Sequence, residues 1–316
     1  MTGFLRIDVH HHPSPPSYLS ARFEKDKQYG QQKDWTVARS LEDMDRGGVA
    51  TAVLSLPHSV QIWPGNVHAG RGLARDWNEF MRKMASDHPG RFGMFAALPI
   101  LDIDGSLLEV EYALDTLKAD GIALMTNIGD KWLGDTYYAP IFEELNRRNA
   151  VLYTHPVAPN CCRGIIEEFN DSVIEYGADT TRAMGKVLYG GAAARYPNIR
   201  FIFSHAGGTL PYTAYRFIRH YRNARPEIKA RMPDGIVVAL NKFHYDTANC
   251  ANIYAMSSFT KLISISQLMF GTDFPFGNAA HDVRGLVEEC GFSDADLEAI
   301  FGGNASRLLP RLSSDR

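Results

Sequence analysis

Hydrophobic residues occur along the chain as short, continuous runs rich in β-branched side chains, separated by segments with helical periodicity. The runs lie near residues 4–9, 49–56, 93–98, 121–126, 150–154, 199–204, 236–246 and 267–272. The helical segments lie near 41–46, 73–86, 107–118, 141–148, 174–195, 210–222, 254–262 and 283–289. Runs that are apolar throughout, rather than at alternate positions, are typical of strands covered on both faces.

The regular alternation of strand and helix predicts parallel strands, because each parallel connection needs a crossover helix. Eight such units in 316 residues predict one α/β domain over residues 1–316, a (β/α)8 TIM barrel with elaborated βα loops. The alternative is an open doubly wound sheet. No Gly-x-Gly-x-x-Gly or Walker-type loop follows any run. The first and last runs both end on residues of types that bind metals, and only a closed sheet would bring those two ends together.

Several of these runs end on residues that bind metals. The first stops on the histidine cluster His10–His12, and later runs end on His155, His205 and Asp273. Alternation along a strand points His10 and His12 to the same face, where they can chelate one cation. A single histidine or aspartate at a strand end is more often a cap or a core hydrogen-bonding group. Repetition at distant points instead indicates one rim of a barrel, where active sites lie. Asp246 ends the seventh run, and it either orients a ligand histidine or caps the next helix.

Composition favours a cytoplasmic globular enzyme. Hydrophobic residues make up 45%, and 33 basic against 36 acidic residues give a net charge of −3, which argues against a nucleic-acid or membrane partner. Four cysteines, of which Cys161 and Cys162 are adjacent, form no disulfide framework. Thiolate metal binding by this pair is less favoured than an ordinary role, since adjacent side chains point in opposite directions. The long segment 13–36 after the first histidines is predicted to be a substrate lid.

The motifs Asp-x-His-x-His, Thr-His-Pro, Ser-His-Ala-Gly-Gly-Thr-Leu-Pro and Gly-Thr-Asp-Phe-Pro occur in this order along the chain. With them, the sequence resembles the amidohydrolase superfamily from residue 6 to about residue 309. More narrowly, it resembles the branch that contains α-amino-β-carboxymuconate-ε-semialdehyde, γ-resorcylate and 6-methylsalicylate decarboxylases.

The resemblance implies that His10, His12, His155 and Asp273 bind one divalent metal and that His205 is catalytic, acting beside a metal-bound water or the substrate. A fifth-ligand role for His205 is the alternative. Three imidazoles and one carboxylate suit zinc. The resorcylate-type relatives replace the first His-x-His by Glu-x-Ala and tend to use manganese, so that the two histidines here favour zinc over manganese. The fourth run carries no lysine that could bridge a second metal.

The expected activity is metal-dependent, non-oxidative decarboxylation of an aromatic or unsaturated carboxylic acid. Asp273 is the preferred donor of a proton to the carbon that bears the carboxylate, with His205 polarising the substrate or activating water. Two alternatives remain open. A metal-bound hydroxide could hydrolyse a lactone, ester or amide on the same barrel, or the chain could be a zinc-binding scaffold without activity.

Substrate contacts are expected from rim aromatics, namely Trp35, Trp63, Trp132 and Phe276, because a flat substrate gains from ring contacts. The resemblance also matches Arg216 to an arginine that reaches into a neighbouring subunit's active site and holds a substrate carboxylate. It therefore implies a homodimer or a higher homo-oligomer. A solvated arginine on a helix surface is the alternative.

Overall fold

Eight parallel strands form one sheet in the computed structural model, which describes residues 3–16, 32, 34–57, 67–129 and 131–314. The strand order is β1-β2-β3-β4-β7-β8-β9-β10. The bounds are β1 (Ile7–His11), β2 (Thr51–Leu54), β3 (Phe92–Ala97), β4 (Gly121–Met125), β7 (Val151–His155), β8 (Arg200–Phe203), β9 (His244–Asp246) and β10 (Leu268–Met269). Strand order along the sheet thus follows the order along the chain.

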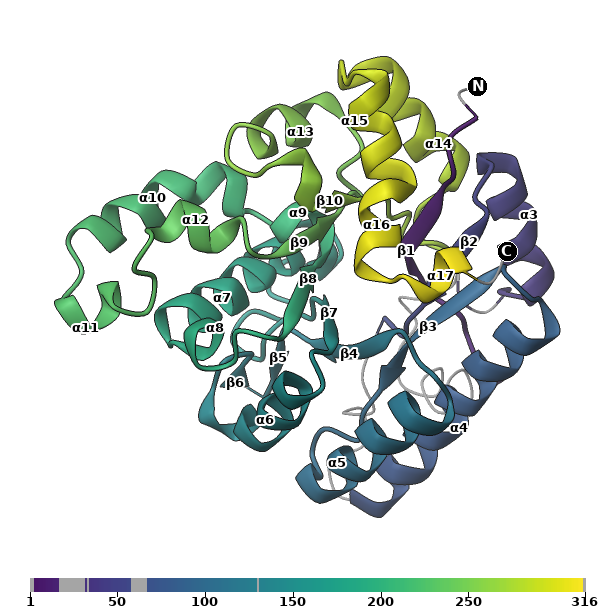
Figure 1. Cartoon of the computed structure of the whole chain (residues 1–316), viewed down its shortest axis with the longest axis horizontal. Coiled ribbons are helices and arrows are strands. Elements are labelled where there is room, and N and C mark those ends of the chain that lie inside the picture. The colour runs from purple at the N-terminus through teal and green to yellow at the C-terminus, as the bar shows by residue number, and fades with distance from the viewer. Residues whose placement is uncertain (1–2, 17–31, 33, 58–66, 130, 315–316) are drawn as a thin grey trace.

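Hydrogen bonds between the first strand and the segment around the last one close the sheet. The Val9 N–H donates to the carbonyl of Phe270, and the Asp273 N–H donates to the carbonyl of His10, both at 2.9 Å. His11 and Phe274 form a further parallel bridge. Figure 1 shows β1 beside β10 and the C-terminal helices, although nearly the whole chain separates them. The predicted TIM barrel is confirmed.

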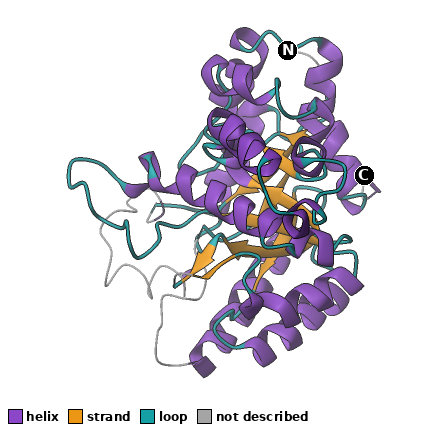
Figure 2. Cartoon of the chain, turned by 90° about the vertical axis from the view of Figure 1, so that its left-hand side faces the viewer, coloured by secondary structure: helices purple, strands orange, loops and turns teal. Residues whose placement is uncertain are grey.

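Helices surround the strands (Figure 2). Those that follow the barrel strands or extend the βα units are α3 (Val37–Gly47), α4 (Val67–Asp87), α5 (Ile103–Glu111), α6 (Ala139–Arg147), α7 (Glu175–Tyr189), α8 (Ala192–Arg195), α10 (Leu210–Arg222), α11 (Pro226–Lys229), α12 (Ile236–Leu240), α13 (Ile253–Phe259) and α14 (Ala279–Arg284). The chain ends with α15 (Asp294–Glu298), α16 (Asn304–Leu308) and α17 (Arg311–Ser314). Within the described part of the chain, no helix combines the length and the apolar character needed to cross a membrane.

Shorter elements fill the connections. α5 and α14 are each extended by a π-helical turn, Tyr112–Thr116 and Gly285–Glu289 respectively. A third π-helical turn, Ala299–Gly303, precedes α16. Single 3-10 turns cover Thr136–Tyr138, Asp171–Val173 and Ile265–Gln267. A small antiparallel hairpin of β5 (Asn127–Ile128) and β6 (Lys131–Trp132) follows β4.

The predicted strand over 236–246 is wrong in its first half. Residues 236–240 form α12, and the strand is only the three residues of β9. Ile236 and Leu240 lie about one helical turn apart and are both buried. Residues four positions apart share one face of a helix and also one face of a strand, so that this short apolar run fits the periodicity of either element. The remaining predicted strands correspond to β1–β4, β7, β8 and β10 with shifted ends.

Two layers of apolar side chains hold the barrel. Inside it, residues from successive strands pack against each other and against α16 and α17, among them Ile7, Val9, Val53, Phe95, Tyr153, Ile202, Met269 and Leu308. A second, larger cluster lies between the strands and the outer helices. A filled interior leaves only the ends of the barrel free for a site.

Candidate metal centre and active site

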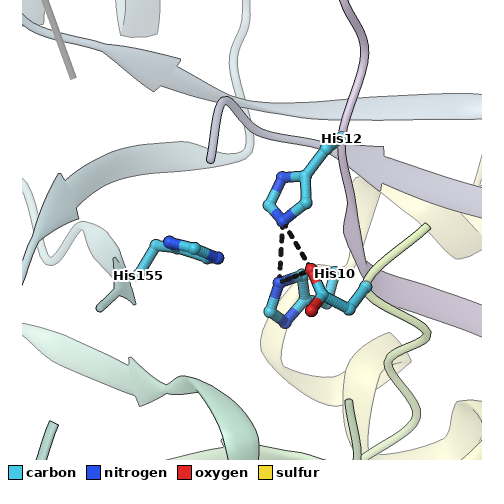
Figure 3. A group of neighbouring side chains, drawn as sticks. His10, His12 and His155 are labelled. Atoms are coloured by element: carbon cyan, nitrogen blue, oxygen red, sulfur yellow. Dashed lines mark hydrogen bonds and ion pairs between the residues drawn. The ribbon is translucent and has the colours of Figure 1, made fainter. Parts of the chain in front are cut away.

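Four side chains converge at the carboxyl ends of three strands. His10 lies in β1 and His12 directly follows it, His155 ends β7, and Asp273 follows β10. One ligand atom from each lies within 4.8 Å of those of the others, and all four residues are buried. Figure 3 shows the imidazoles of His10, His12 and His155 grouped around one point. The structure thus brings together the four residues that the sequence nominated as ligands.

All three imidazoles present the same nitrogen to this point. The Nδ1 of His10 lies 3.0 Å from Asp246 Oδ2, that of His12 lies 2.8 Å from the Ser55 carbonyl, and that of His155 lies 2.9 Å from the Pro156 carbonyl. Since each of these partners is an acceptor, each Nδ1 carries a proton, and each Nε2 is the nitrogen left to bind a cation, whether a proton or a metal ion. The Nε2 atoms of His10 and His12 lie only 2.9 Å apart.

The carboxylate of Asp273 completes the group. Its Oδ1 lies 2.9 Å from His12 Nε2 and 3.1 Å from His10 Nε2, yet this buried oxygen has no hydrogen-bond partner among the described residues. Lone pairs that face one another at such distances repel unless a cation lies between them. The donor set therefore fits a divalent metal ion.

The charges in the site favour a cation. Burial alone would lower the pKa of His10, but Asp246 and Asp273 raise it to about 10. Burial lowers the pKa of His12, and burial together with the neighbouring histidines lowers that of His155 much further. Although burial opposes ionisation of Asp273, the charge on His10 holds the pKa of this carboxyl well below its usual range. The chain thus stabilises one positive charge here, and a metal ion would take the place of that proton.

Buried carboxylates fix the strands that carry the group. Asp246 accepts from His10 Nδ1 and also, through Oδ1, from the backbone N–H of His205 at 2.9 Å. Asp8 accepts from the N–H of His10 at 2.9 Å and from the hydroxyl of Thr272 at 2.7 Å. Of the two interpretations of Asp246, the structure shows the contact with the His10 imidazole, whereas the next helix is capped by Asn252. Asp8 links the first strand to the segment that bears Asp273.

His205 lies at the edge of the group rather than within it. It follows β8 in a tight turn, α9 (Ser204–Gly207), where His205 and Ala206 have φ of +54° and +51°. This conformation is costly for residues with a side chain, and the Asp246 bond to the His205 N–H helps to hold it. The Nε2 of His205 lies 3.4 Å from Asp273 Oδ2, within reach of a molecule bound in the cavity beside it.

A cavity of about 560 Å³ opens onto these residues. His155, His205 and Asp273 form its floor, and its walls are Pro57, Asn170, Ser172, Val173, Tyr176, Gly177, Gly208, Thr209, Asn249, Cys250 and Phe276. This volume lies in the range of sites that bind small molecules. Among the described residues that line it there is no lysine or arginine.

The other predicted contact residues divide between the cavity and other places. Phe276 lines the cavity. Trp35 does not: it is buried in the outer core, where its indole N–H donates to Ser40 Oγ at 3.0 Å. Trp132 is likewise used structurally, donating to the buried carboxylate of Asp179 at 2.6 Å. Arg216 is exposed on α10 and does not line the cavity of its own chain.

Two expectations fall partly outside the structure or outside the site. Trp63, and residues 17–31 and 33 of the predicted lid, lie outside the described residues. Cys161 and Cys162 are free thiols and do not belong to the four-residue group.

The sequence analysis missed Asn249 and Cys250, which follow β9 and line the cavity. The Asn249 amide donates to Asp273 Oδ2 at 2.6 Å. The one available signal was their position three and four residues after Asp246, which placed them on the same rim.

A profile of the amidohydrolase family matches residues 7–311. The decarboxylase macB of Penicillium terrestre is 32% identical over 97% of this chain and 95% of that protein. The 6-methylsalicylic acid decarboxylase of Penicillium expansum is 31% identical over 97% of each. Among solved structures, a dihydroxybenzoic acid decarboxylase from Polaromonas with bound manganese and 2-nitroresorcinol matches with a TM-score of 0.82, 23% identity and 97% of each chain covered.

The chain belongs to the amidohydrolase family. Within the family it falls in the branch of the aromatic-acid decarboxylases, which are carbon–carbon lyases.

Proposed function

We propose that the chain is a metal-dependent, non-oxidative decarboxylase of an aromatic or similarly unsaturated carboxylic acid, of the hydroxybenzoate kind. The observation that carries the proposal is the common direction of the Nε2 atoms of His10, His12 and His155 with Asp273 Oδ1. The cavity beside these residues, which has the volume of a small-molecule site, and the decarboxylases among the relatives support it further.

In this proposal the four residues hold one divalent cation. When bound there, such a cation would supply Lewis-acid chemistry that helps to orient the acid substrate and stabilises negative charge on it. We propose zinc, because the chain keeps both histidines of the first motif, although a related protein of known structure binds manganese.

Asp273 and His205 would move the proton. Because the low pKa of Asp273 leaves its carboxylate ionised at rest, this group would act as a relay. Asp273 Oδ2 would take a proton from His205, whose Nε2 lies 3.4 Å away, and deliver it to the ring carbon that bears the carboxylate. Protonation of that carbon interrupts the conjugation of the ring. The bond to the carboxylate then breaks, its electron pair restores the aromatic ring, and carbon dioxide leaves. The ring of Phe276 forms part of the wall against which a flat substrate would lie.

We further propose that the protein works as a homodimer or higher homo-oligomer in which Arg216 completes the site of a neighbouring subunit. The described cavity wall has no cation of its own for a second anionic group. On α10 with Arg216, Tyr212 and Tyr215 are 91% and 66% exposed, and Tyr254 on α13, a helix that contacts α10, is 89% exposed. Clustered exposed tyrosines with arginine are typical of protein interfaces.

The test is a metal analysis combined with decarboxylation assays. Purified protein should contain about one divalent metal per chain, and a chelator should abolish activity that zinc restores. A panel of hydroxybenzoates, including 6-methylsalicylate and 2,6-dihydroxybenzoate, and the aminocarboxymuconate semialdehyde should identify a substrate by release of carbon dioxide. Two metals per chain, or turnover confined to lactones, esters or amides, would contradict the proposal.

A further inference from the structure

The turn after β9 contacts several parts of the site at once. Asp246 holds the His10 ring and the His205 backbone. Three residues later, the Asn249 amide donates to Asp273 Oδ2 at 2.6 Å, and the Cys250 N–H closes the turn on the Thr247 carbonyl at 2.8 Å. A single five-residue segment therefore positions groups that come from β1, β8 and the end of β10.

The backbone at Asn249 suits asparagine in particular. Its φ is +55°, in the left-handed region where asparagine, aspartate and glycine are far better tolerated than other residues. This conformation directs the amide to Asp273 while the residue also lines the cavity. Asparagine thus meets a backbone requirement and a side-chain requirement at one position.

The two oxygens of Asp273 have different surroundings. Oδ1 faces the Nε2 atoms of His10 and His12 at 3.1 and 2.9 Å. Oδ2 accepts from Asn249 and lies 3.4 Å from His205 Nε2. A carboxylate free to rotate can offer both oxygens to a cation, which raises the coordination number and occupies a position that a substrate needs.

We propose that Asn249 is a positioning residue that restricts Asp273 to one metal-facing oxygen and keeps the other directed at His205 and the cavity. The inference rests on the proposed metal-dependent function. Asn249 would act through Asp273, so that its loss should change how the metal is held as well as the rate of turnover.

The test uses two substitutions that preserve the left-handed backbone conformation at residue 249. They are compared with a control substitution elsewhere in the chain. Asn249→Gly removes the amide and still accepts the left-handed φ. Asn249→Asp keeps the size but replaces the N–H donor with oxygen. The control is Asn198→Ala, an exposed position before β8 at the opposite end of the barrel, which should behave as the parent protein does.

Both Asn249 variants should lose turnover by roughly 10- to 100-fold, the usual scale for a residue that supports a metal ligand. Both should keep about one metal per chain and release it to a chelator no faster than the parent. After replacement of the metal with Co²⁺, the visible absorption band should be weaker in the variants, because Co²⁺ absorbs less strongly as its coordination number rises.

Faster metal release in step with the lost turnover would overturn the inference, because it would show only general support of the site. Parent-like turnover and parent-like cobalt absorption in Asn249→Gly would also overturn it. Since the chelator and cobalt measurements need no substrate, they test Asn249 even if the parent proves to catalyse another reaction. A parent chain that binds no metal would refute the proposed function, and this inference with it.

Discussion

The two sides of the cavity differ in how firmly they are held. The metal side is built from the ends of β1, β7, β9 and β10, and its residues are buried, with hydrogen bonds through Asp8 and Asp246 that link the segments of β1, β8 and β10. The opposite side is the segment between β7 and α7, which supplies Asn170, Ser172 and Val173 to the cavity. That segment has no strand or α-helix, and it carries several exposed apolar side chains, including Ile165 and Val173 at 64% and 67% exposure.

The difference indicates a division of labour. A rigid, interlinked set of groups suits a fixed reaction, because small displacements there are costly. A loop that packs few of its side chains tolerates substitution and can accommodate different substrates without disturbing the chemistry. Substitutions on the metal side should therefore abolish the reaction, and those on the loop side should shift substrate preference.

The largest effect is expected for His12→Ala. It removes an Nε2 from the four-residue group, and the purified variant should contain little metal and show no measurable turnover. Elemental analysis and a steady-state assay at saturating substrate measure both. A variant that retained one metal per chain and parent activity would remove His12 from the site.

His205→Ala should separate catalysis from metal binding on the same side. Because His205 lies beside the group and not within it, the variant should keep most of its metal yet lose roughly 100-fold or more in turnover. If the protein emerges without metal, His205 is a ligand, and the metal side contains five metal-binding groups rather than four.

Arg216→Ala tests whether the cavity is complete in one chain. We expect a strong rise in KM, on the order of 10-fold, from loss of a charged contact to the substrate. Mixing this variant with His205→Ala should restore partial activity, because one hybrid site would then contain both intact residues. A fully active monomer in solution, measured by sedimentation together with turnover, would exclude the shared site.

The smallest effect is expected on the loop side. Val173→Ala should change the ratio of kcat/KM between two substrates of different ring substitution by less than about 10-fold. Its stability should stay within about 0.5 kcal/mol of the parent, since the side chain is exposed. Leu108→Ala, at a 60% exposed position on α5, serves as the control and should change neither quantity. A complete loss of turnover in Val173→Ala would contradict the proposed difference between the metal side and the loop side.

The sequence predicted the metal side better than anything else in the molecule. His10, His12, His155 and Asp273 are strong ligand types, and each stands at the end of an apolar run, so that closure of the barrel brings them together. Asn249 gave no such signal, because asparagine is common in turns and its contact with Asp273 depends on a left-handed backbone that the sequence does not reveal.

The predictions for Trp35 and for the segment 236–246 were wrong for a different reason. An aromatic residue that lines the rim of the barrel and one that packs in the core look alike in a sequence. The indole N–H of Trp35 donates to Ser40 Oγ, away from the cavity. In the same way, the apolar residues of 236–240 fit a strand and a helix equally well, and tertiary packing chose the helix.

Closure of the barrel between β1 and β10 also has a consequence for synthesis of the protein. His10 and His12 leave the ribosome before Asp273, which follows His12 by 261 residues (273 minus 12). A nascent or truncated chain that lacks β10 has the histidines but neither the carboxylate nor the hydrogen bonds that align the first strand. Tight metal uptake would thus require a chain that includes β10 and Asp273, and metal content would report how many molecules in a preparation have closed the barrel.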